Sequence, residues 1–291
     1  MISKRALIAA LIIGYGALLS SAPAHAQALP TPKQLVSGLD LECYRTPGPS
    51  MDFDLTLTHL NPVLRDLGLP QHQVRIKELV QTCVPVRKNN AWPAQPALPF
   101  IRHIDSACYR VEAEPFPSPI AINLTHLNPV LANLPQHTVY LERPAQLCLP
   151  VAKNGKLPPD DVLALVRFID LECYQTDPQP HPQFTVGLTQ LNPQLDFIPP
   201  HTMMLDWQPR QLCVPVRKNA QFIPPAYLNI IKYIDLEKFA ADPVVPVAPV
   251  NVQLQHLNPL FANLPWVPVV LQWAVALAVP VAKNGDIPPN D

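Results

Sequence analysis

The stretch Ile169-Asp170-Leu171-Glu172-Cys173-Tyr174 decides the fold of this 291-residue chain, because it recurs three more times at intervals of 65 residues. The other copies begin at Leu39, Ile104 and Ile234, and the last of them has Lys238 where the others have cysteine. Apolar and polar residues alternate in each copy, which predicts a short strand with the cysteine facing inward. We therefore expect four copies of one small unit.

The rest of each copy follows a common plan. A second alternating run ends in a Leu-Asn-Pro turn, as at Asn61-Pro62, and a third strand region leads to a second cysteine position. Each copy closes on Pro-Val-x-Lys-Asn, first at residues 85–89, and a proline-led apolar segment then predicts one or two helical turns. The expected fold class is mainly β, with four tandem small β-rich domains and short linker helices. The expected boundaries are 27–93 for repeat 1, 94–157 for repeat 2, 158–222 for repeat 3 and 223–291 for repeat 4.

The cysteines predict one disulfide in each of the first three repeats. The six positions are Cys43, Cys83, Cys108, Cys148, Cys173 and Cys213. Six cysteines allow 15 pairings. Repeat 4 has lost both of its cysteines, at Lys238 and Ala278, so bridges between adjacent repeats would leave Cys213 without a partner. Pairing within repeats, as in Cys43–Cys83, leaves none. The alternatives are a metal cluster and a redox pair, but the chain has no CxxC.

The first 26 residues predict a cleaved signal peptide. Lys4 and Arg5 precede the apolar run 6–19, and Ala24-His25-Ala26 offers a small-x-small cleavage site. The run is shorter than the roughly 18–20 residues of a membrane span. No later stretch reads as a transmembrane segment, because prolines interrupt every apolar run. We expect an extracytoplasmic protein, secreted or periplasmic, in which an even number of cysteines favours disulfides.

Composition excludes several classes of function. The chain has 39 prolines, 8 glycines and a net charge of −1, with no basic run. Nucleic acid binding is therefore not expected. A proline-rich chain with so little glycine also argues against phosphate-binding loops, while 48% apolar residues are too many for a disordered tract.

No catalytic, cofactor or metal site is predicted. The four serines of the mature chain lie outside any nucleophile elbow; they are Ser37, Ser50, Ser106 and Ser118. Histidines flank the Leu-Asn-Pro turn, with His59, His126 and His256 before it and His72, His137 and His201 after it. A His/His pair with an added carboxylate could bind zinc. However, Gln190 and Val267 interrupt the two series, so structural histidines are the favoured interpretation.

Two charged positions also repeat. A lysine precedes the closing asparagine of each copy, at Lys88, Lys153, Lys218 and Lys283, and is expected to be a solvated turn residue. A row of cations for anionic glycans or lipid headgroups is the alternative. An aspartate lies three residues before each first cysteine position, at Asp40, Asp105, Asp170 and Asp235, and a backbone-capping role is expected.

Repeat 4 differs chemically from the others, because no charged residue occurs from Pro243 to Ala282. Two explanations stay open. A larger apolar core packed against repeat 3 could replace the lost bridge, or the surface could be an interface for another protein or another copy.

The pattern Asp-x-x-Cys-Tyr followed by Leu-Cys-x-Pro-Val-x-Lys-Asn resembles a tandem cysteine-paired domain of unknown function in secreted bacterial proteins. The stretch Leu147–Gly155 carries the resemblance most clearly, and repeat 4 departs from it at Ala278. The resemblance implies an exported multi-copy module and supplies no catalytic residue.

The function expected from the sequence is therefore non-enzymatic: binding, adhesion or envelope structure, without a cofactor. The expected partner is an unknown protein or envelope component, with repeat 4 as the candidate surface. The alternative is a metal-dependent or hydrolytic enzyme whose site forms between repeats.

Overall fold

The computed structural model describes residues 27–69, 71–177, 183–205 and 211–291, and the predicted signal peptide lies outside them. Repeat 1 contains α1 (Pro32–Val36), β1 (Asp40–Arg45), β2 (Ser50–His59), α2 (Pro62–Asp66) and β3 (Gln71–Lys88). Repeat 2 contains α3 (Leu98–Ile101), β4 (Ser106–Glu112), β5 (Ile120–His126), the 3-10 helix η1 (Pro129–Leu131) and β6 (His137–Lys153). Repeat 3 contains α4 (Asp160–Val166), β7 (Asp170–Thr176), β8 (Phe184–Gln190), β9 (His201–Leu205) and β10 (Gln211–Lys218). Repeat 4 contains α5 (Pro225–Ile231), β11 (Leu236–Pro243), β12 (Val250–His256), η2 (Pro259–Phe261), β13 (Val267–Leu271) and β14 (Ala274–Lys283). The chain is mainly β, as the sequence predicts.

Eight of these strands close into a cylinder. Their order is β1, β3, β4, β6, β7, β10, β11 and β14, and β14 pairs back to β1. Each repeat supplies its first and last strand, and each last strand also pairs with the first strand of the next repeat. The expectation of four tandem domains is not confirmed, because strands of all four repeats form one sheet. The physical reason is that a single repeat would expose unpaired strand edges, which closure removes.

A second set of pairings joins opposite repeats, and we call each of them a latch. The four latches pair Leu57–His59 with Val216–Lys218, Leu124–His126 with Val281–Lys283, Leu188–Gln190 with Val86–Lys88, and Leu254–His256 with Val151–Lys153. Repeat 1 is thereby joined to repeat 3, and repeat 2 to repeat 4. The closing asparagine completes each latch. Asn219, for example, accepts the Thr56 N–H on Oδ1 at 2.9 Å and adopts a left-handed φ of 47°.

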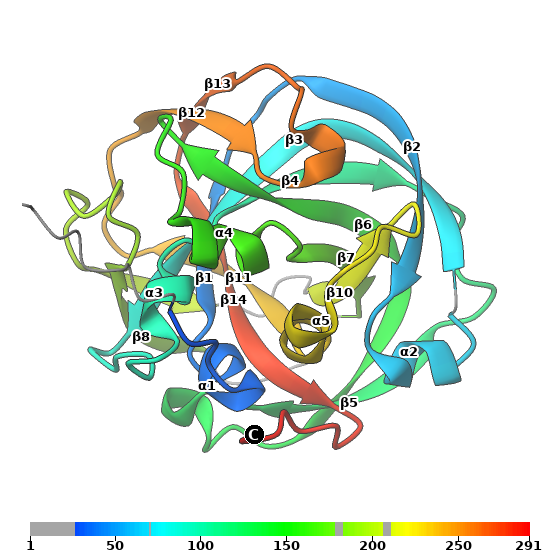
Figure 1. Ribbon diagram of the computed structural model, residues 1–291. Helices are drawn as coiled ribbons and strands as arrows, with labels where there is room; N and C mark the ends of the chain where they lie inside the picture. Colours follow the sequence, from blue (N-terminus) through cyan, green and yellow to red (C-terminus); the bar gives the residue numbers. More distant parts are fainter. Residues whose placement is uncertain (1–26, 70, 178–182, 206–210) are drawn as a thin grey trace, which may run out of the picture.

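Short helices cover one end of the cylinder. Figure 1 shows α1, α3, α4 and α5 grouped there, and α1 contacts both α3 and α5. One apolar core joins these helices to the inward-facing side chains of the cylinder, including Phe100 and Leu165 from helices and Leu41 and Leu171 from strands. A second core lies between the outer face of the cylinder and the covering hairpins, so the first strand of each repeat is buried on both faces.

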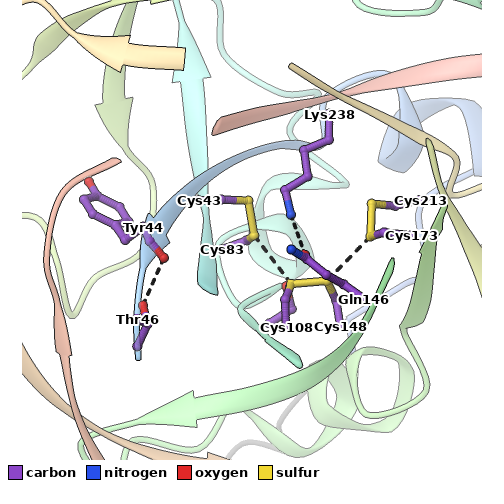
Figure 2. The surroundings of a disulfide bond; sticks show 11 residues. Cys43, Tyr44, Thr46, Cys83, Cys108, Gln146, Cys148, Cys173, Cys213 and Lys238 are labelled. Atoms are coloured by element: carbon purple, nitrogen blue, oxygen red, sulfur yellow. Dashed lines mark hydrogen bonds between the residues drawn. A yellow bond between two sulfur atoms is a disulfide. The ribbon is translucent and has the colours of Figure 1, made fainter. Parts of the chain in front are cut away.

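The structure contains the three disulfides expected from the sequence: Cys43–Cys83, Cys108–Cys148 and Cys173–Cys213. Each joins residues directly opposite each other on paired strands. All three belong to the inner core, and Figure 2 shows them side by side. Sulfurs of neighbouring bridges approach to 3.7 Å, as between Cys83 and Cys108. Lys238 and Ala278 stand opposite each other at the fourth position of this ring.

No helix in the described part of the chain is long and apolar enough to cross a membrane.

Candidate functional site

The repeated stretch at the start of each unit divides its side chains between the two faces of the cylinder. In β7, Leu171 and Cys173 belong to the inner core. Residues at alternate positions of a strand point the other way, so Asp170, Glu172 and Tyr174 face outward beneath the hairpin of another repeat. All three are buried. A buried polar face of this kind must find partners within the protein.

At the glutamate and tyrosine positions the partners come from the opposite repeat, and they form clusters at four equivalent places in the fold. Site I contains His59, His72, Glu172 and Tyr174, and site II contains His126, His137, Glu237 and Phe239. Site III contains Gln190, His201, Glu42 and Tyr44, and site IV contains Tyr109 and His256, with Ala107 and Val267 at the two remaining equivalent positions. Every site lies beside a latch, because one of its residues ends the latched segment of a strand. These residues are His59 in site I, His126 in site II, Gln190 in site III and His256 in site IV.

Site I brings two imidazoles to one carboxylate. His72 Nε2 lies 2.8 Å from Glu172 Oε1. Tyr174 donates its hydroxyl proton to Glu172 Oε2 at 2.7 Å, and His59 Nε2 lies 3.1 Å from the same hydroxyl. The two imidazole rings stack with centroids 5.6 Å apart. Glu172 is fully buried, whereas the His72 side chain is 25% exposed, so solvent reaches the site from the His72 side.

The environment keeps one histidine of site I neutral. Burial, together with the charges of His72 and Lys283, lowers the pKa of His59 to about 3. Burial also acts to lower the pKa of His72, but the hydrogen bond and charge of Glu172 outweigh it, so that pKa is raised. The Tyr174 hydroxyl stays protonated, because burial and the neighbouring Glu172 raise its pKa well above 10. At neutral pH the site holds an unprotonated imidazole.

Site II repeats this arrangement between repeats 2 and 4. His137 Nε2 lies 2.9 Å from Glu237 Oε1, and His126 Nε2 lies 3.6 Å from Glu237 Oε2. Phe239 replaces the tyrosine and stacks on His126 with centroids 6.0 Å apart. The two sites therefore share the His/His/Glu set and differ in one hydroxyl.

The other two sites lack part of this set. In site III, Gln190 takes the place of the first histidine and donates to Glu42 Oε2 at 2.7 Å, while His201 Nε2 lies 2.7 Å from Glu42 Oε1. In site IV the carboxylate and the second histidine are both missing, replaced by Ala107 and Val267. The glutamate and the histidine that faces it are thus kept together or lost together.

The residues of sites I and II fit a metal ion. In each, one ligand atom from every histidine and from the glutamate lies within 4.8 Å of the other two. Two imidazoles and one carboxylate are a donor set used by zinc and by non-haem iron. Sequence reasoning recognised the histidine pairs but favoured a structural role. The carboxylate comes from the repeat two positions away, and no sequence spacing indicated that.

The repeated lysines and aspartates lie in a separate network. Each lysine forms a buried ion pair with the aspartate of its own repeat: Lys88–Asp40, Lys153–Asp105, Lys218–Asp170 and Lys283–Asp235. The prediction of solvated lysines is therefore wrong, since all four are at most 1% exposed. The capping role expected for the aspartates is not what the structure shows either, because their partners are side chains.

The asparagine of the Leu-Asn-Pro turn completes each ion pair. Asn128 donates to Asp40 Oδ2 at 2.8 Å, and its own Oδ1 accepts the Val130 N–H at 2.9 Å, which caps η1. Burial lowers the pKa of Lys88 and raises that of Asp40, each opposed by the charge of the other. Each lysine, aspartate and asparagine thus form a triad that joins adjacent repeats. Because all three side chains are buried, the triads present no surface to a ligand.

Comparison with known proteins adds no relative, because no family model, no curated protein and no solved structure matches this chain.

Proposed function

We propose that this chain is an exported protein that binds a divalent transition metal at sites I and II. The observation that carries the proposal is the convergence of two histidines and one glutamate from opposite repeats, twice in the chain. Imidazole and carboxylate ligands suit zinc, and copper, nickel and iron compete for the same donors. We name zinc as the first ion to test, because three protein ligands of this type are typical of zinc sites.

A bound ion would join repeats that already meet at a latch. Site I links repeat 1 to repeat 3, and site II links repeat 2 to repeat 4. An ion that binds the folded state alone stabilises it in proportion to the logarithm of its concentration. Metal binding would therefore raise the unfolding temperature of the whole cylinder.

Export is the second part of the proposal. Disulfides persist in oxidising compartments and are rare in the cytosol, and this chain has three of them. Together with the N-terminal segment, they support a secreted or periplasmic location. The resemblance to cysteine-paired domains of secreted bacterial proteins stays a prediction.

The test is a metal titration of the mature, metal-stripped chain by calorimetry, with the ion content checked by elemental analysis. Wild-type protein is expected to bind two zinc ions, H59Q one, and H59Q/H126Q none. The glutamine is a fitting replacement, since Gln190 occupies the equivalent position of site III without loss of the fold. H256Q is the matched control, because His256 belongs to site IV and should leave two ions bound. Equal zinc content in wild type and H59Q/H126Q would refute the proposal.

Metal-dependent catalysis is the second candidate function. Three protein ligands leave a coordination position for water, as in catalytic zinc sites. The Tyr174 hydroxyl lies beside that set in site I. Burial of Glu172 and Tyr174 favours binding over turnover. A hydrolase screen of the zinc-loaded chain decides: turnover that H59Q abolishes and H256Q preserves would establish the enzyme.

A protein or envelope partner for repeat 4 also remains our proposal. Large apolar side chains of this repeat are exposed, including Val245 at 68% and the two tryptophans Trp266 and Trp273 at 44% and 45%. Capture from an envelope fraction should be compared between wild type and W266S/W273S. Equal capture of all proteins by both would remove repeat 4 as the docking surface.

A further inference from the structure

A cavity lies between repeats 3 and 4. Its volume is about 620 Å³. One wall is the segment 197–202, which leads into β9, and the other is the segment 244–250, which joins β11 to β12. The pairing of β9 with β11 holds the two walls side by side, and the Val244 N–H donates to the Thr202 carbonyl oxygen at 2.9 Å where they meet. A cavity of this size is typical of small-molecule sites.

The lining of the cavity is apolar and uncharged. Phe197 lines it together with aliphatic side chains and prolines, and of the described residues around it His201 and Thr202 alone carry polar side chains. Both ring nitrogens of His201 are already in hydrogen bonds, one with Glu42 and one with the Pro199 carbonyl oxygen. A charged molecule would lose its hydration here without gaining a counterion. The lining therefore favours an uncharged ligand.

Prolines keep the cavity open. Two stand in each wall: Pro199, Pro200, Pro246 and Pro249. A proline ring fixes φ at about −65°, so neither wall can readily fold inward to bury its apolar side chains. Phe197 and Val245 stay 64% and 68% exposed beside the cavity. A site that is held in place before the ligand arrives loses less conformational entropy on binding.

Repeat 2 fills the equivalent space with an aromatic side chain. Phe116 and Pro246 are equivalent, because each lies eight residues after the first cysteine position of its repeat and four before the next strand, which begins at Ile120 or Val250. Phe116 is half-buried, and its ring packs against Tyr174 of site I with centroids 5.4 Å apart. Pro246 is exposed and brings no such ring to the cavity beside site III.

We propose that this cavity binds a small uncharged molecule with an aromatic ring, and that the ring takes the place that the Phe116 side chain fills in repeat 2. Burial of an aromatic ring against aliphatic side chains gives a large apolar contact area. The proposal is separate from the metal sites, because no residue of sites I and II is among those that line the cavity. It is also separate from the tryptophan surface of repeat 4, since neither Trp266 nor Trp273 is among them.

The experiment titrates the metal-stripped mature chain with N-phenyl-1-naphthylamine, an uncharged aromatic dye whose fluorescence rises in apolar surroundings. Wild type is expected to bind one dye molecule per chain. Pro246→Phe should weaken binding at least ~20-fold, because the introduced ring fills the cavity. Pro246→Ala removes the proline without adding a ring, so it is the matched control and should bind within ~3-fold of wild type.

Two further measurements test the class of ligand. Phe116→Ala empties the equivalent space in repeat 2 and should raise the number of bound dye molecules from one to two, and the double variant Phe116→Ala/Pro246→Phe should return it to one. The dye 1-anilinonaphthalene-8-sulfonate has the same rings and a negative charge. Wild type should bind it at least ~10-fold more weakly than the uncharged dye.

Equal dye affinity in wild type and Pro246→Phe, with both folded by circular dichroism, would overturn the proposal. A single bound dye molecule in Phe116→Ala would overturn it as well, and this count decides the matter even where Pro246→Phe does not fold. Dye binding that disappears as the protein concentration rises, with a dimer detected by light scattering, would show that a second copy of the chain covers the cavity instead. Since the chain is free of metal throughout, none of these outcomes bears on sites I and II.

Discussion

His72 in repeat 1 and Glu172 in repeat 3 are 100 residues apart in sequence, yet His72 Nε2 lies 2.8 Å from Glu172 Oε1. The contact exists because the β2–β3 hairpin of repeat 1 crosses to the closing strand of repeat 3 and pairs with it. Each of the other three hairpins likewise pairs with the closing strand of the repeat two positions away. The candidate metal sites are therefore products of closure and cannot form within one repeat.

The first prediction is that Gln190→His creates a third metal site. Site III already has His201 and Glu42 in the positions of the second histidine and the carboxylate, so one substitution completes the His/His/Glu set. We expect zinc stoichiometry to rise from two to three ions per chain by calorimetry. V267H, which adds a histidine to site IV without a carboxylate, is the control and should leave the count at two. Unchanged stoichiometry in Q190H would show that the geometry does not select metal.

The second prediction concerns the ion pairs of the closing motif. Lys88→Met leaves the Asp40 carboxylate buried with Asn128 as its remaining partner. Removing one member of a buried pair typically costs about 3–5 kcal/mol, so the urea midpoint should fall accordingly. Lys156→Met, at an exposed position, is the control and should stay within about 0.5 kcal/mol of wild type. A loss below 1 kcal/mol for Lys88→Met would contradict the pairing.

The third prediction restores the missing bridge. Lys238 and Ala278 have the same register as Cys43 and Cys83, so K238C/A278C is expected to form a fourth disulfide. Closing a 40-residue loop stabilises by up to about 4 kcal/mol in the chain-entropy model. The bridge is checked by mass under reducing and non-reducing conditions, and the gain by thermal unfolding. K238C alone is the control and should show no gain.

The fourth prediction concerns acid stability. Burial and the charge of Lys218 lower the pKa of His256 to about 4, and its Nδ1 is buried without a hydrogen bond in the described structure. The unfolded chain binds this proton near pH 6.5 and the folded chain does not. The free energy of unfolding therefore carries no penalty from His256 above pH 6.5, and it falls as the pH drops from 6.5 toward 4.

His256→Gln should remove this penalty, as the natural Gln190 does in repeat 3. The difference in unfolding free energy between pH 7 and pH 5 should shrink by roughly 2 kcal/mol relative to wild type. Urea titrations at both pH values measure it. An identical pH dependence in the two proteins would show that His256 is protonated in the folded state.

The fifth prediction is that repeat 4 cannot be removed. Deleting residues 224–291 takes away β14, which pairs with β1 and β5, and β12, which pairs with β6. We expect the truncated chain to lose cooperative thermal unfolding by circular dichroism. A cooperative transition in the truncated chain would show that three repeats suffice. Point substitutions, and not truncation, are therefore the way to test repeat 4 as a docking surface.

Much of the local structure could be predicted from the sequence. The 65-residue period indicated the repeats, the joint loss at Lys238 and Ala278 indicated the bridges, and alternation indicated the strands. What it could not indicate is which repeat faces which, because the same period fits four separate domains or one closed ring. The buried lysines were missed for a related reason: a lysine before an asparagine turn is normally exposed. Its partner is an aspartate at the other end of the same repeat, Asp40 for Lys88, and that aspartate also accepts a hydrogen bond from Asn128 of the next repeat.

The latches also set the order in which the protein can be completed as it emerges from a ribosome or a translocation channel. Strand β2 has no latch strand until β10 has appeared, and the second edge of β1 stays unpaired until β14 has appeared. Each disulfide, by contrast, joins two strands of one repeat, so it can form as soon as that repeat has emerged. The disulfides of the first three repeats can therefore form before the latches close. Repeat 4 is the last of the four repeats to emerge, so its strands can pair with those of the other repeats immediately. It is also the repeat without a disulfide.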